Sequence, residues 1–506
     1  MLRTVRVEPG YLEFASRARE GNLIPVWCEI LADTETPISA FLKIRDLPYA
    51  FLLESVEGSQ KLARYSFLGG RPLLVVATAS DGTTEVQKKG GIQRRRGDPL
   101  EIAREVLSPY RPVDDPNLRA VLPRFTGGLL GYFGYDLVRW WENLPNKPPD
   151  DLGCPVIELV LVDTVLAFDH LTNRIRVIAH AFIEEDDVHA TYRRAVERVE
   201  EMVEKLGTPA RARERGDGRA ERNATVTVEA NIGREEFLSK VATAKEYIFA
   251  GDIFQVILSQ RFRVSPILVD PFDLYRALRA INPSPYMFYL DFPTVKLVGA
   301  SPEMLVRLEG EEVEMRPIAG TRPRGTTPEE DERLAEDLLQ DEKERAEHIM
   351  LVDLTRNDLG RISRYGSVTV SELMTIERYS HVMHLVSTIS GKLAAGRNAF
   401  DVLRAVFPHG TVTGAPKVRA MEIIDELEPT ARGPYAGAVG YVDFRGNMDT
   451  AITIRTILVK EGSAYIQAGA GIVADSIPER EFEETVNKAR ALLKAIELAG
   501  SPSRPR

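Results

Sequence analysis

The sequence predicts a mixed α/β fold (α+β), a multi-layer sandwich built on large sheets. Strand-like apolar runs recur in both halves of the chain, and helical patterns lie among them without a regular strand–helix alternation. No self-similar unit recurs at a spacing of about 20–50 residues, so a solenoid is not expected. These observations favour large sheets flanked by helices over a parallel βαβ arrangement.

Length and composition fit an ordinary globular protein. The chain has 506 residues, 44% hydrophobic and 28% charged, enough for roughly two to four domains. No apolar run reaches the about 18 residues that a membrane helix needs, and the first residues lack the apolar segment of a secretory signal. The two cysteines, Cys28 and Cys154, have no disulfide or metal spacing. We therefore expect a protein of the reducing cytoplasm.

The net charge of −10 argues against a nucleic-acid or membrane-surface partner. It also constrains the mechanism of substrate capture. If the substrate is an anion, the surface as a whole does not attract it. A local site must then supply the attraction.

Residues 1–207 are expected to form an N-terminal domain. The runs 48–55, 72–79 and 155–168 have the apolar and β-branched content of strands. The basic cluster 88–96 contains a Gly-Gly pair and is typical of a hairpin tip exposed to solvent. These patterns predict a strand-rich first half.

Two segments of this region are rich in small or polar residues. The glycine-rich segment 126–139 lacks the strand–GxGxxG–helix order of a nucleotide-binding fingerprint, so close packing of backbones is the better interpretation. Residues 208–230 are the predicted linker, because their first part is polar, charged and short of large apolar side chains.

A second domain is expected over residues 231–500. It opens with a helical pattern over 234–252 that ends at Gly251, and a strand follows at 254–264. A second long helical pattern, 479–500, closes the domain. The candidate chemistry of the chain lies between and within these elements.

Two helical windows each carry acidic side chains on one face. Glu344 and Glu347 are three residues apart, and Glu481, Glu484 and Lys488 share a face at i, i+3 and i+7. Either set alone is typical of a solvated stripe. Together, two such helices can build a site for Mg²⁺, which takes oxygen ligands and typically one or two protein carboxylates.

An anion site is the natural neighbour of such a cation. A strand runs into Gly469, Ala470 and Gly471, and Ser476 and Pro478 then signal the start of a helix. Backbone N–H groups at glycines and at a helix N-terminus can donate to an anion. The alternative is a tight strand-to-helix turn without a ligand.

Further candidate substrate contacts come from other segments. Residues 315–330 and 409–429 are rich in Gly, Thr, Pro and basic residues, which suits carboxylate recognition. Alternation along the expected strand 451–459 places Arg455 among apolar neighbours. A buried guanidinium needs a partner, which is either a substrate carboxylate or a structural salt bridge.

His384 is one of seven histidines in the chain. Strand alternation places it on one side with Val382, Val386 and Thr388. Such a histidine is either a hydrogen-bonded core residue or an acid–base catalyst near neutral pH.

Several long motifs, in order, resemble the chorismate-utilising enzymes. They are GDIFQVILSQRF (251–262), SPEMLVR (301–307), PIAGTRPRG (317–325), ERAEHIMLVDLTRNDLG (344–360), HGTVTGAPK (409–417) and QAGAGIVADSIPEREFEET (467–485). The resemblance extends from about residue 10 to 495 and is nearest to the large subunits of anthranilate synthases. It implies large antiparallel sheets with flanking helices and a chorismate-binding catalytic domain in the second half.

The resemblance also implies roles for individual residues. Glu347 and Glu484 match magnesium ligands, with Glu344 and Glu481 beside them. Thr411 and His384 match residues that line the reacting ring, and Glu303 matches the acid that protonates the departing 4-hydroxyl. The matches to chorismate contacts are Gly320, Thr321, Tyr435, Arg455, Gly469, Ala470, Gly471 and Lys488.

The implied reaction is Mg²⁺-dependent amination of chorismate at C2 followed by loss of pyruvate, which gives anthranilate for tryptophan biosynthesis. Relatives that use water carry a lysine where Gln255 stands, so ammonia is the expected nucleophile. Many aminodeoxychorismate synthases carry a lysine where Ala319 stands, which favours anthranilate. An aminodeoxychorismate synthase and a non-catalytic tryptophan- or chorismate-binding regulator remain the alternatives.

The resemblance further implies feedback inhibition by tryptophan. The first half contributes FLLES (51–55) and RYSFLG (64–69), and the second contributes NPSPYMF (282–288). The residues implied to line the inhibitor pocket are Glu54, Ser55, Pro285, Tyr286, Met287, Val439 and Tyr441.

The chain has no Gly-x-Cys-x-Gly nucleophile turn and no amidotransferase domain. The resemblance therefore implies a separate glutamine amidotransferase small subunit that supplies ammonia, and hence a hetero-oligomer. Free ammonium is expected to replace that subunit in vitro.

Overall fold

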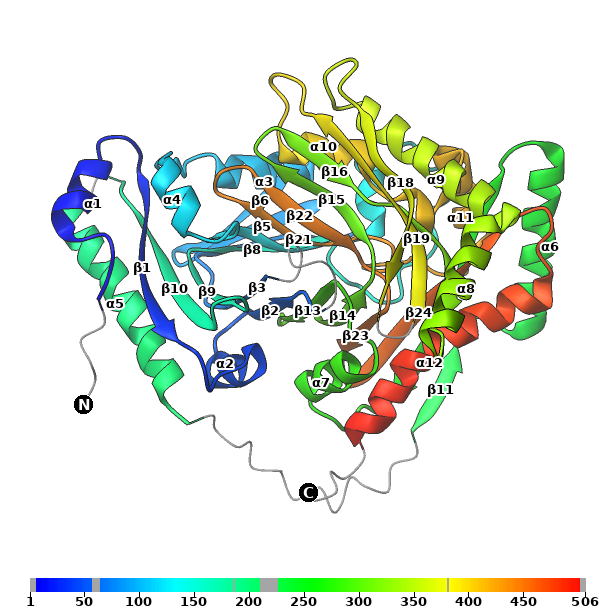
Figure 1. The fold of residues 1–506 in the computed structure, drawn as a ribbon, viewed down its shortest axis with the longest axis horizontal. Helices are drawn as coiled ribbons and strands as arrows, with labels where there is room; N and C mark the ends of the chain where they lie inside the picture. The colour runs from blue at the N-terminus through cyan, green and yellow to red at the C-terminus, as the bar shows by residue number, and fades with distance from the viewer. Residues whose placement is uncertain (1–5, 57–63, 185–186, 210–225, 380–381, 501–506) are drawn as a thin grey trace.

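The computed structural model describes residues 6–56, 64–184, 187–209, 226–379 and 382–500. Most of the predicted linker, from residue 210 to 225, lies outside the described residues. Two large antiparallel sheets, each with 12 strands in the described part, pack as layers, and helices cover their outer faces (Figure 1). The predicted fold class is confirmed.

The first sheet begins at an edge strand from the N-terminal region and ends at two strands from the second half of the chain. In spatial order its strands are β1 (Leu23–Leu31), β10 (Arg174–Phe182), β9 (Thr164–Asp169), β3 (Tyr65–Gly69), β2 (Ala50–Glu54), β13 (Tyr286–Asp291), β14 (Lys296–Ser301), β23 (Thr456–Lys460), β24 (Ser463–Ile472), β12 (Gln255–Ser265) and β11 (Thr227–Ala230), with β20 (Gly414–Ala415) also paired to β12.

The second sheet, like the first, takes strands from both halves of the sequence. In spatial order its strands are β17 (Ile318–Pro323), β19 (Val382–Lys392), β16 (Glu312–Met315), β15 (Met304–Glu309), β22 (Met448–Ile452), β21 (Ala438–Asp443), β7 (Gly128–Phe133), β8 (Ile157–Val162), β4 (Leu74–Thr78), β5 (Thr83–Lys88) and β6 (Gly91–Arg96), with β18 (Thr369–Arg378) also paired to β19.

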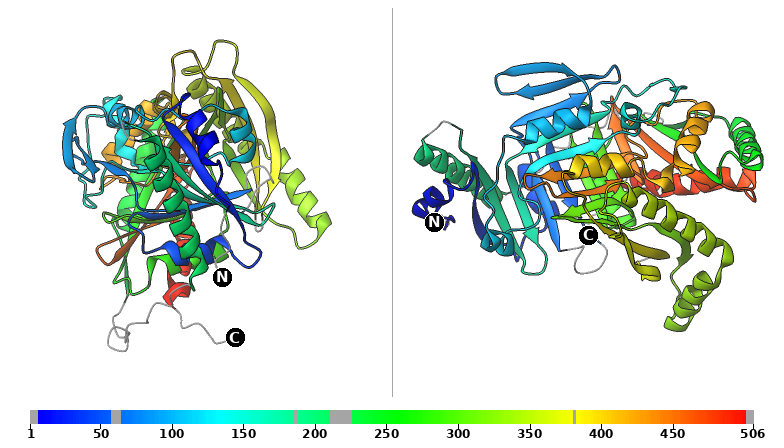
Figure 2. Two further views of the ribbon diagram at one scale, coloured as in Figure 1. Left: turned by 90° about the vertical axis from the view of Figure 1, so that its left-hand side faces the viewer. Right: turned by 90° about the horizontal axis from the view of Figure 1, so that it is seen from above.

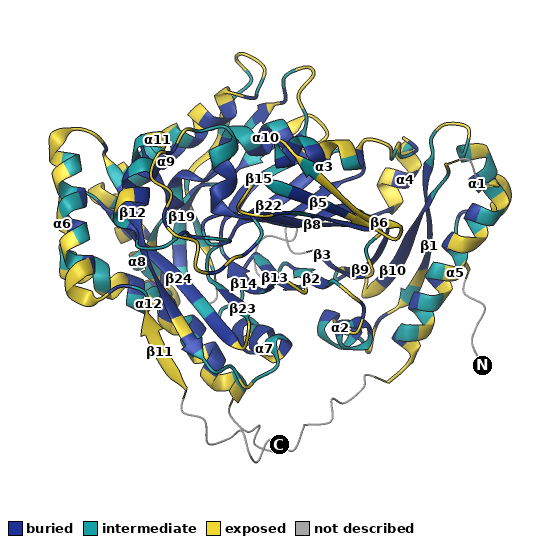
Figure 3. Ribbon diagram, turned by 180° about the vertical axis from the view of Figure 1, so that it is seen from behind, coloured by how far each residue is buried: buried dark blue, intermediate teal, exposed yellow. Residues whose placement is uncertain are grey.

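The helices lie outside the sheets, with one side buried and the other exposed to solvent (Figure 3). They are α1 (Tyr11–Arg17), α2 (Pro37–Ile44), α3 (Pro99–Leu107), α4 (Pro116–Val121), α5 (Val188–Gly207), α6 (Arg234–Ala250), α7 (Pro271–Ile281), α8 (Pro328–Gln340), α9 (Glu342–Gly360), α10 (Ala399–Val406), α11 (Lys417–Leu427) and α12 (Pro478–Gly500). Among the described residues, the short 3₁₀ turns η1 (Tyr135–Trp140) and η3 (Gly410–Val412) interrupt the connections.

Both halves of the sequence contribute strands to both sheets. In the first sheet Met287 of β13 pairs with Glu54 of β2, and in the second Tyr441 of β21 pairs with Leu130 of β7. Figure 2 shows these layers from the side and from above. The predicted domains, 1–207 and 231–500, are therefore joined by continuous sheets. Where one domain ends and the next begins stays a prediction.

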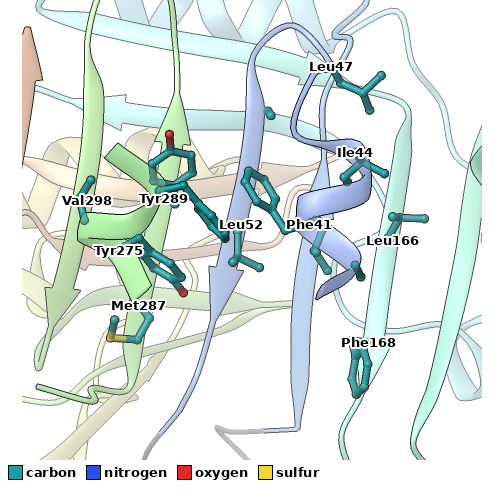
Figure 4. Packing of buried hydrophobic residues seen from close by; sticks show 14 of the residues in the cluster. Phe41, Ile44, Leu47, Leu52, Leu166, Phe168, Tyr275, Met287, Tyr289 and Val298 are labelled. Carbon is teal, nitrogen blue, oxygen red and sulfur yellow. The ribbon is translucent and has the colours of Figure 1, made fainter. Parts of the chain in front are cut away.

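One buried core cluster packs helices onto the first sheet across this junction. Phe41 of α2 contacts Phe272 of α7, with ring centroids 4.6 Å apart, and Tyr289 of β13, at 5.5 Å. Figure 4 shows Tyr275, Met287 and the other labelled side chains of this cluster filling the space between α2, α7 and the strands. Burial of such aromatic and aliphatic groups is the main force that holds the two halves together.

The run 155–168 forms two strands and not one, which corrects the prediction. β8 belongs to the second sheet and β9 to the first, and Asp163 lies between them. The backbone oxygen of Asp163 accepts from the N–H of His180 at 2.7 Å. The chain changes sheets at this residue, and an unbroken apolar pattern does not reveal the change because both strands are buried.

The predicted hairpin and helix ends are confirmed. β5 and β6 form a hairpin with the glycines at its tip, and α6 ends at Gly251, which has the left-handed φ of +83°. The glycine-rich segment packs closely, as predicted. A Cβ on Gly131 would lie 2.0 Å from the backbone oxygen of Glu158, so only glycine allows β7 and β8 to approach in this way.

Candidate active site

A pocket of about 250 Å³ opens where the two sheets and α12 meet. This volume is slightly below the about 300 Å³ at which small-molecule pockets begin. Of the eleven residues assigned to the ring and substrate contacts, ten line this one pocket, from segments far apart in sequence. They are Glu303, Gly320, Thr321, His384, Thr411, Tyr435, Arg455, Gly469, Gly471 and Lys488.

Ala470 lies elsewhere. Alternation along β24 turns its side chain to the opposite face of the sheet, into the core cluster under α6 and α11. It is fully buried there and does not line the pocket. Gln467, Ala468 and the flanking glycines Gly469 and Gly471 bring this strand to the site.

Glu303 is a buried acid at the base of the pocket, 6% exposed. Its Oε2 lies 3.2 Å from the Thr411 hydroxyl, and its Oε1 has no hydrogen-bond partner among the described residues. Burial raises the pKa of Glu303 to about 8, and a hydrogen bond from the backbone N–H of Ile318 lowers it by less. The carboxyl group is therefore protonated at neutral pH and can act as an acid.

His384 lies on β19 opposite the turn of β17. Its Nδ1 is 3.0 Å from the backbone oxygen of Gly320 and 3.1 Å from the Thr321 hydroxyl. Burial lowers the pKa of His384, so the ring is neutral. Because a carbonyl oxygen only accepts, Nδ1 carries the proton and Nε2 keeps a free lone pair.

Arg455 is not on a strand, which corrects the prediction. β22 ends at Ile452 and β23 begins at Thr456, and Arg455 in the gap has the left-handed φ of +51°. Its Nη1 donates to the backbone oxygen of Lys488 at 3.1 Å. In the described residues no carboxylate lies within ion-pair distance of it, and burial lowers the pKa of Arg455. The guanidinium thus faces the pocket without a close ion pair, and the charge of Glu484 acts on it from a greater distance.

The glycines of β24 form a second wall. β23 pairs only with Ser463–Ile466 of β24, so the later residues have an open edge. Lys488 Nζ uses this edge and donates to the oxygen of Gly469 at 2.9 Å. A Cβ on Gly469 would lie 2.9 Å from the Tyr435 hydroxyl, so glycine leaves the space beside that edge open.

Two carboxylate pairs face each other from α9 and α12. Burial raises the pKa of Glu347, and Glu344, Glu484 and Glu481 raise it further through repulsion. The pKa of Glu481 is raised by burial and by Glu484. Nearby cations are Lys343, 3.9 Å from Glu347, and Lys488, 2.6 Å from Glu484. The carboxylates of α9 and α12 are thus close enough to repel one another, as the predicted pairing of the two helices requires.

The carboxylates do not form a ready-made cage. Across the described ranges, no group of three or more His, Cys, Asp or Glu side chains is arranged closely enough to hold a metal ion. Glu344 nevertheless borders the pocket, since a Cβ on Gly320 would lie 3.1 Å from its Oε2. Oxygen donors of this kind, open to water and to a substrate anion, are those that Mg²⁺ prefers.

A second cavity of about 60 Å³ lies between the sheets. All seven residues assigned to the inhibitor pocket line it: Glu54, Ser55, Pro285, Tyr286, Met287, Val439 and Tyr441. Its polar side includes residues that sequence reasoning missed. The Tyr286 hydroxyl donates to Asp449 at 3.0 Å and accepts from Arg307 at 3.1 Å. Arg307 ends the SPEMLVR motif (301–307), which was the available signal for it, whereas Asp449 lies in none of the quoted motifs.

Sequence reasoning also missed a buried arginine that joins two backbone segments behind the substrate pocket. Arg432, 2% exposed, pairs with Glu428 and donates to the backbone oxygens of Ile257 (2.8 Å) and Val412 (2.7 Å), both of which line the pocket. Its guanidinium also lies over the Tyr135 and Tyr435 rings. His409, beside Thr411 in the HGTVTGAPK motif, is a further missed residue. A polar side chain within an otherwise matched motif was the available signal for it.

None of the described helices is long and apolar enough to cross a membrane. The buried cysteines, Cys28 and Cys154, are both free thiols.

Comparison with known proteins matches residues 51–494 to the chorismate binding enzyme family. Anthranilate synthase component 1 of Acetivibrio thermocellus is 51% identical over 485 residues, covering 96% of this chain and 97% of that protein. The Aquifex aeolicus (strain VF5) component 1 is also 51% identical, over 484 residues, covering 94% and 95%.

Solved structures agree. Anthranilate synthase component I from Streptococcus pneumoniae TIGR4 superimposes with a TM-score of 0.74 at 38% identity, covering 92% of this chain and 98% of that one. The menaquinone-specific isochorismate synthase MenF from Escherichia coli, at 18% identity and a TM-score of 0.69, shares the fold over 96% of this chain and 100% of its own. The resemblance predicted from the motifs is confirmed, and the chain belongs to the chorismate binding enzyme family.

Proposed function

We propose that the chain is the chorismate-aminating component of an anthranilate synthase, which converts chorismate and ammonia to anthranilate and pyruvate. The observation that carries the proposal is that one pocket contains both a protonated buried acid, Glu303, and a cation without a close ion pair, Arg455. Relatives at about half identity over nearly the full chain have the same name.

Chorismate is a dicarboxylate, and the pocket offers donors for it. The Arg455 guanidinium faces the pocket without a close ion pair, and Lys488 and the open edge of Gly469 lie beside it. A charge-assisted contact to a carboxylate would satisfy the buried guanidinium. These local donors provide the attraction that a net charge of −10 denies to an anion.

Glu303 is the proposed acid for the departing 4-hydroxyl. A hydroxyl group leaves slowly unless it gains a proton, and a carboxyl group with a pKa of about 8 still holds one at neutral pH. Thr411 fixes the orientation of the carboxyl group at 3.2 Å. The acid, the cation and the ring-binding wall are thus arranged around one cavity.

His384 is the proposed aid to the second step. After ammonia has added at C2, the C2 proton must leave together with pyruvate to aromatise the ring. With Nδ1 donating to Gly320, the neutral ring offers Nε2 as a base. Tyr435 and Thr321 complete the surface against which the ring lies.

Mg²⁺ is the proposed cofactor, held by Glu347 and Glu484 with Glu344 and Glu481 beside them. When bound, the ion would neutralise the ring carboxylate and withdraw electron density from the breaking C–O bond. The fit rests on the raised pKa values of Glu344, Glu347 and Glu481, since carboxylates that burial and mutual repulsion disfavour gain from a cation.

Ammonia, not water, is the proposed nucleophile, because Gln255 stands where water-using relatives have a lysine. Ala319 lines the pocket in place of the lysine of many aminodeoxychorismate synthases, which favours anthranilate. A glutamine amidotransferase small subunit is the proposed ammonia source in a hetero-oligomer. The relatives are named component 1, which supports a second component. We place the enzyme in the cytoplasm.

Tryptophan is the proposed feedback inhibitor at the cavity between the sheets. That cavity, about 60 Å³, is smaller than the about 300 Å³ at which small-molecule pockets begin. Binding of an indole side chain therefore requires the walls around Ser55 and Met287 to separate. Because β2 and β13 pair directly, such a separation would distort the sheet that also contains β24 of the active site.

The test is turnover by the purified chain with chorismate, Mg²⁺ and ammonium. The expected products are fluorescent anthranilate and pyruvate in equal amounts. Accumulation of a non-aromatic amino product without pyruvate would assign the chain to aminodeoxychorismate synthesis. Binding of chorismate or tryptophan without turnover would identify a non-catalytic regulator.

A further inference from the structure

Three side chains form a chain of hydrogen bonds beneath the substrate pocket. The Thr411 hydroxyl lies 3.2 Å from Oε2 of Glu303 and 2.7 Å from Nδ1 of His409. Glu303 and His409 are 6% and 3% exposed, so water does not compete for these contacts. His409 is the N-cap residue of η3, which carries Thr411 into the pocket.

The direction of the hydrogen bonds follows from the histidine. The backbone N–H of Thr411 points at His409 Nδ1 over 3.3 Å, so Nδ1 accepts and the ring proton is on Nε2. The short contact between Nδ1 and the Thr411 hydroxyl then requires the hydroxyl to donate. A hydroxyl has one hydrogen, so Thr411 can offer Glu303 only a lone pair.

This orientation matters for the charge of Glu303. An acceptor at Oε2 stabilises the protonated carboxyl group and does nothing for the carboxylate. Oε1 of Glu303 lies 3.5 Å from Nδ1 of His409, where it also meets a lone pair. Neither Thr411 nor His409 therefore donates to the carboxyl group, and the backbone N–H of Ile318 remains as a donor that favours the carboxylate. The two acceptors oppose ionisation in addition to the effect of burial.

We propose that His409 is a positioning residue that, through Thr411, keeps Glu303 in the protonated form. His409 does not touch the substrate, since it does not line the pocket. The proposal rests on the proposed function only for the use of the proton as the acid of the first step. The coupling of His409 to Glu303 is a property of the ligand-free protein.

The other charged groups near the chain are accounted for. Burial and then Lys417 lower the pKa of His409 to about 3, so it stays neutral over the useful range. Lys417 of α11 is itself paired with Asp358 of α9 at 2.6 Å. Arg455 and His384 line the same pocket as Glu303. These groups are the same in every variant below.

The test measures protonation of Glu303 directly in the ligand-free chain. The infrared carbonyl band of its protonated carboxyl group is assigned by subtracting the spectrum of Glu303→Gln, and its intensity is followed with pH. In His409→Leu, Thr411 loses its acceptor and turns its hydrogen toward Glu303. The midpoint should fall by about one pH unit, a tenfold shift toward the carboxylate.

His409→Asn is the matched control. An asparagine oxygen can accept from the Thr411 N–H at an N-cap position and from the hydroxyl, so the midpoint should stay at the wild-type value. Melting temperatures check that both variants are folded. A wild-type midpoint in folded His409→Leu, or an equal shift in the leucine and asparagine variants, would overturn the proposal.

A measurement on the unaltered protein covers the case in which His409→Leu does not fold. Nitrogen-15 NMR of labelled histidine distinguishes the two neutral tautomers, and His409→Asn assigns the signal. The proton is expected on Nε2, and a proton on Nδ1 would refute the proposal. Neither readout involves turnover, so a shifted midpoint in a chain that fails to aminate chorismate would contradict only the proposed function.

Discussion

The ammonium group of Lys488 lies 2.6 Å from the carboxylate of Glu484, one turn earlier on α12. The same Nζ donates to the oxygen of Gly469 at 2.9 Å. One lysine thus bridges a proposed magnesium ligand and the glycine wall of the substrate pocket. In the ligand-free protein it supplies the positive charge at the edge where the metal and the substrate carboxylate are proposed to meet.

Glu484→Ala is expected to abolish Mg²⁺-dependent turnover and to leave the fold intact. The Glu484 side chain is 47% exposed, and its ion pair with Lys488 on a solvated helix contributes only about 0.3–0.5 kcal/mol. The measurement is anthranilate formation against Mg²⁺ concentration, together with the melting temperature. Glu479→Ala, exposed at the start of α12, is the control. Equal turnover in the Glu484 and Glu479 variants would refute the metal assignment.

His384→Ala is expected to slow aromatisation more than amination. The variant removes the Nε2 base and leaves Glu303 and Arg455 in place, and loss of a general base lowers the rate of its step by about 10²–10⁴. Quenched reactions analysed for an amino intermediate, anthranilate and pyruvate separate the two steps. The intermediate should accumulate. If both steps slow by the same factor, the histidine has no special role in the second.

Ser55→Phe is expected to relieve inhibition by tryptophan. A benzyl group in the roughly 60 Å³ cavity occupies the space that the inhibitor must enter. The inhibition constant should rise by at least about tenfold, or about 1.4 kcal/mol, with little change in chorismate kinetics. Ser80→Phe, on an exposed turn outside this cavity, is the control. Unchanged inhibition in Ser55→Phe would remove Ser55 from the pocket.

Periodicity and glycine signals predicted local elements well, because those signals are local. The end of α6 at Gly251 and the hairpin of β5 and β6 depend on residues next to one another in sequence. The exchange between sheets at Asp163 was missed, because a run buried in two different layers has the same apolar pattern as a run buried in one.

Site residues were predicted through motifs, and the failures have a physical origin. Arg455 was placed on a strand because its neighbours are apolar, whereas the strand breaks there and the left-handed φ of +51° turns the guanidinium into the pocket. Ala470 was included with its flanking glycines although strand alternation turns it away. Arg432 acts through contacts with residues distant in sequence, and His409 acts through the hydroxyl of Thr411. No spacing rule detects either kind of contact.

Glu303 is expected to make the stability of the protein depend on pH. Burial raises its pKa from 4.5 to about 8, so between these values the folded chain holds a proton that the unfolded chain has lost. The associated stabilisation is complete below pH 4.5 and is lost as the pH rises through about 8. Urea unfolding of the wild type and of Glu303→Gln over this range measures it. Other buried acids, such as Glu158, titrate in both proteins, so the difference between the two free energies of unfolding isolates Glu303.

That difference should shift against the wild type with rising pH, by an amount that levels off above about 8. The same proton is needed for the proposed first step, so wild-type kcat/KM for chorismate should stay level at lower pH and fall as the pH rises through about 8. A pH-independent difference between wild type and Glu303→Gln would mean that Glu303 is ionised in the folded protein at neutral pH. A carboxylate at that position cannot protonate the leaving hydroxyl, and the acid would have to be sought elsewhere in the pocket.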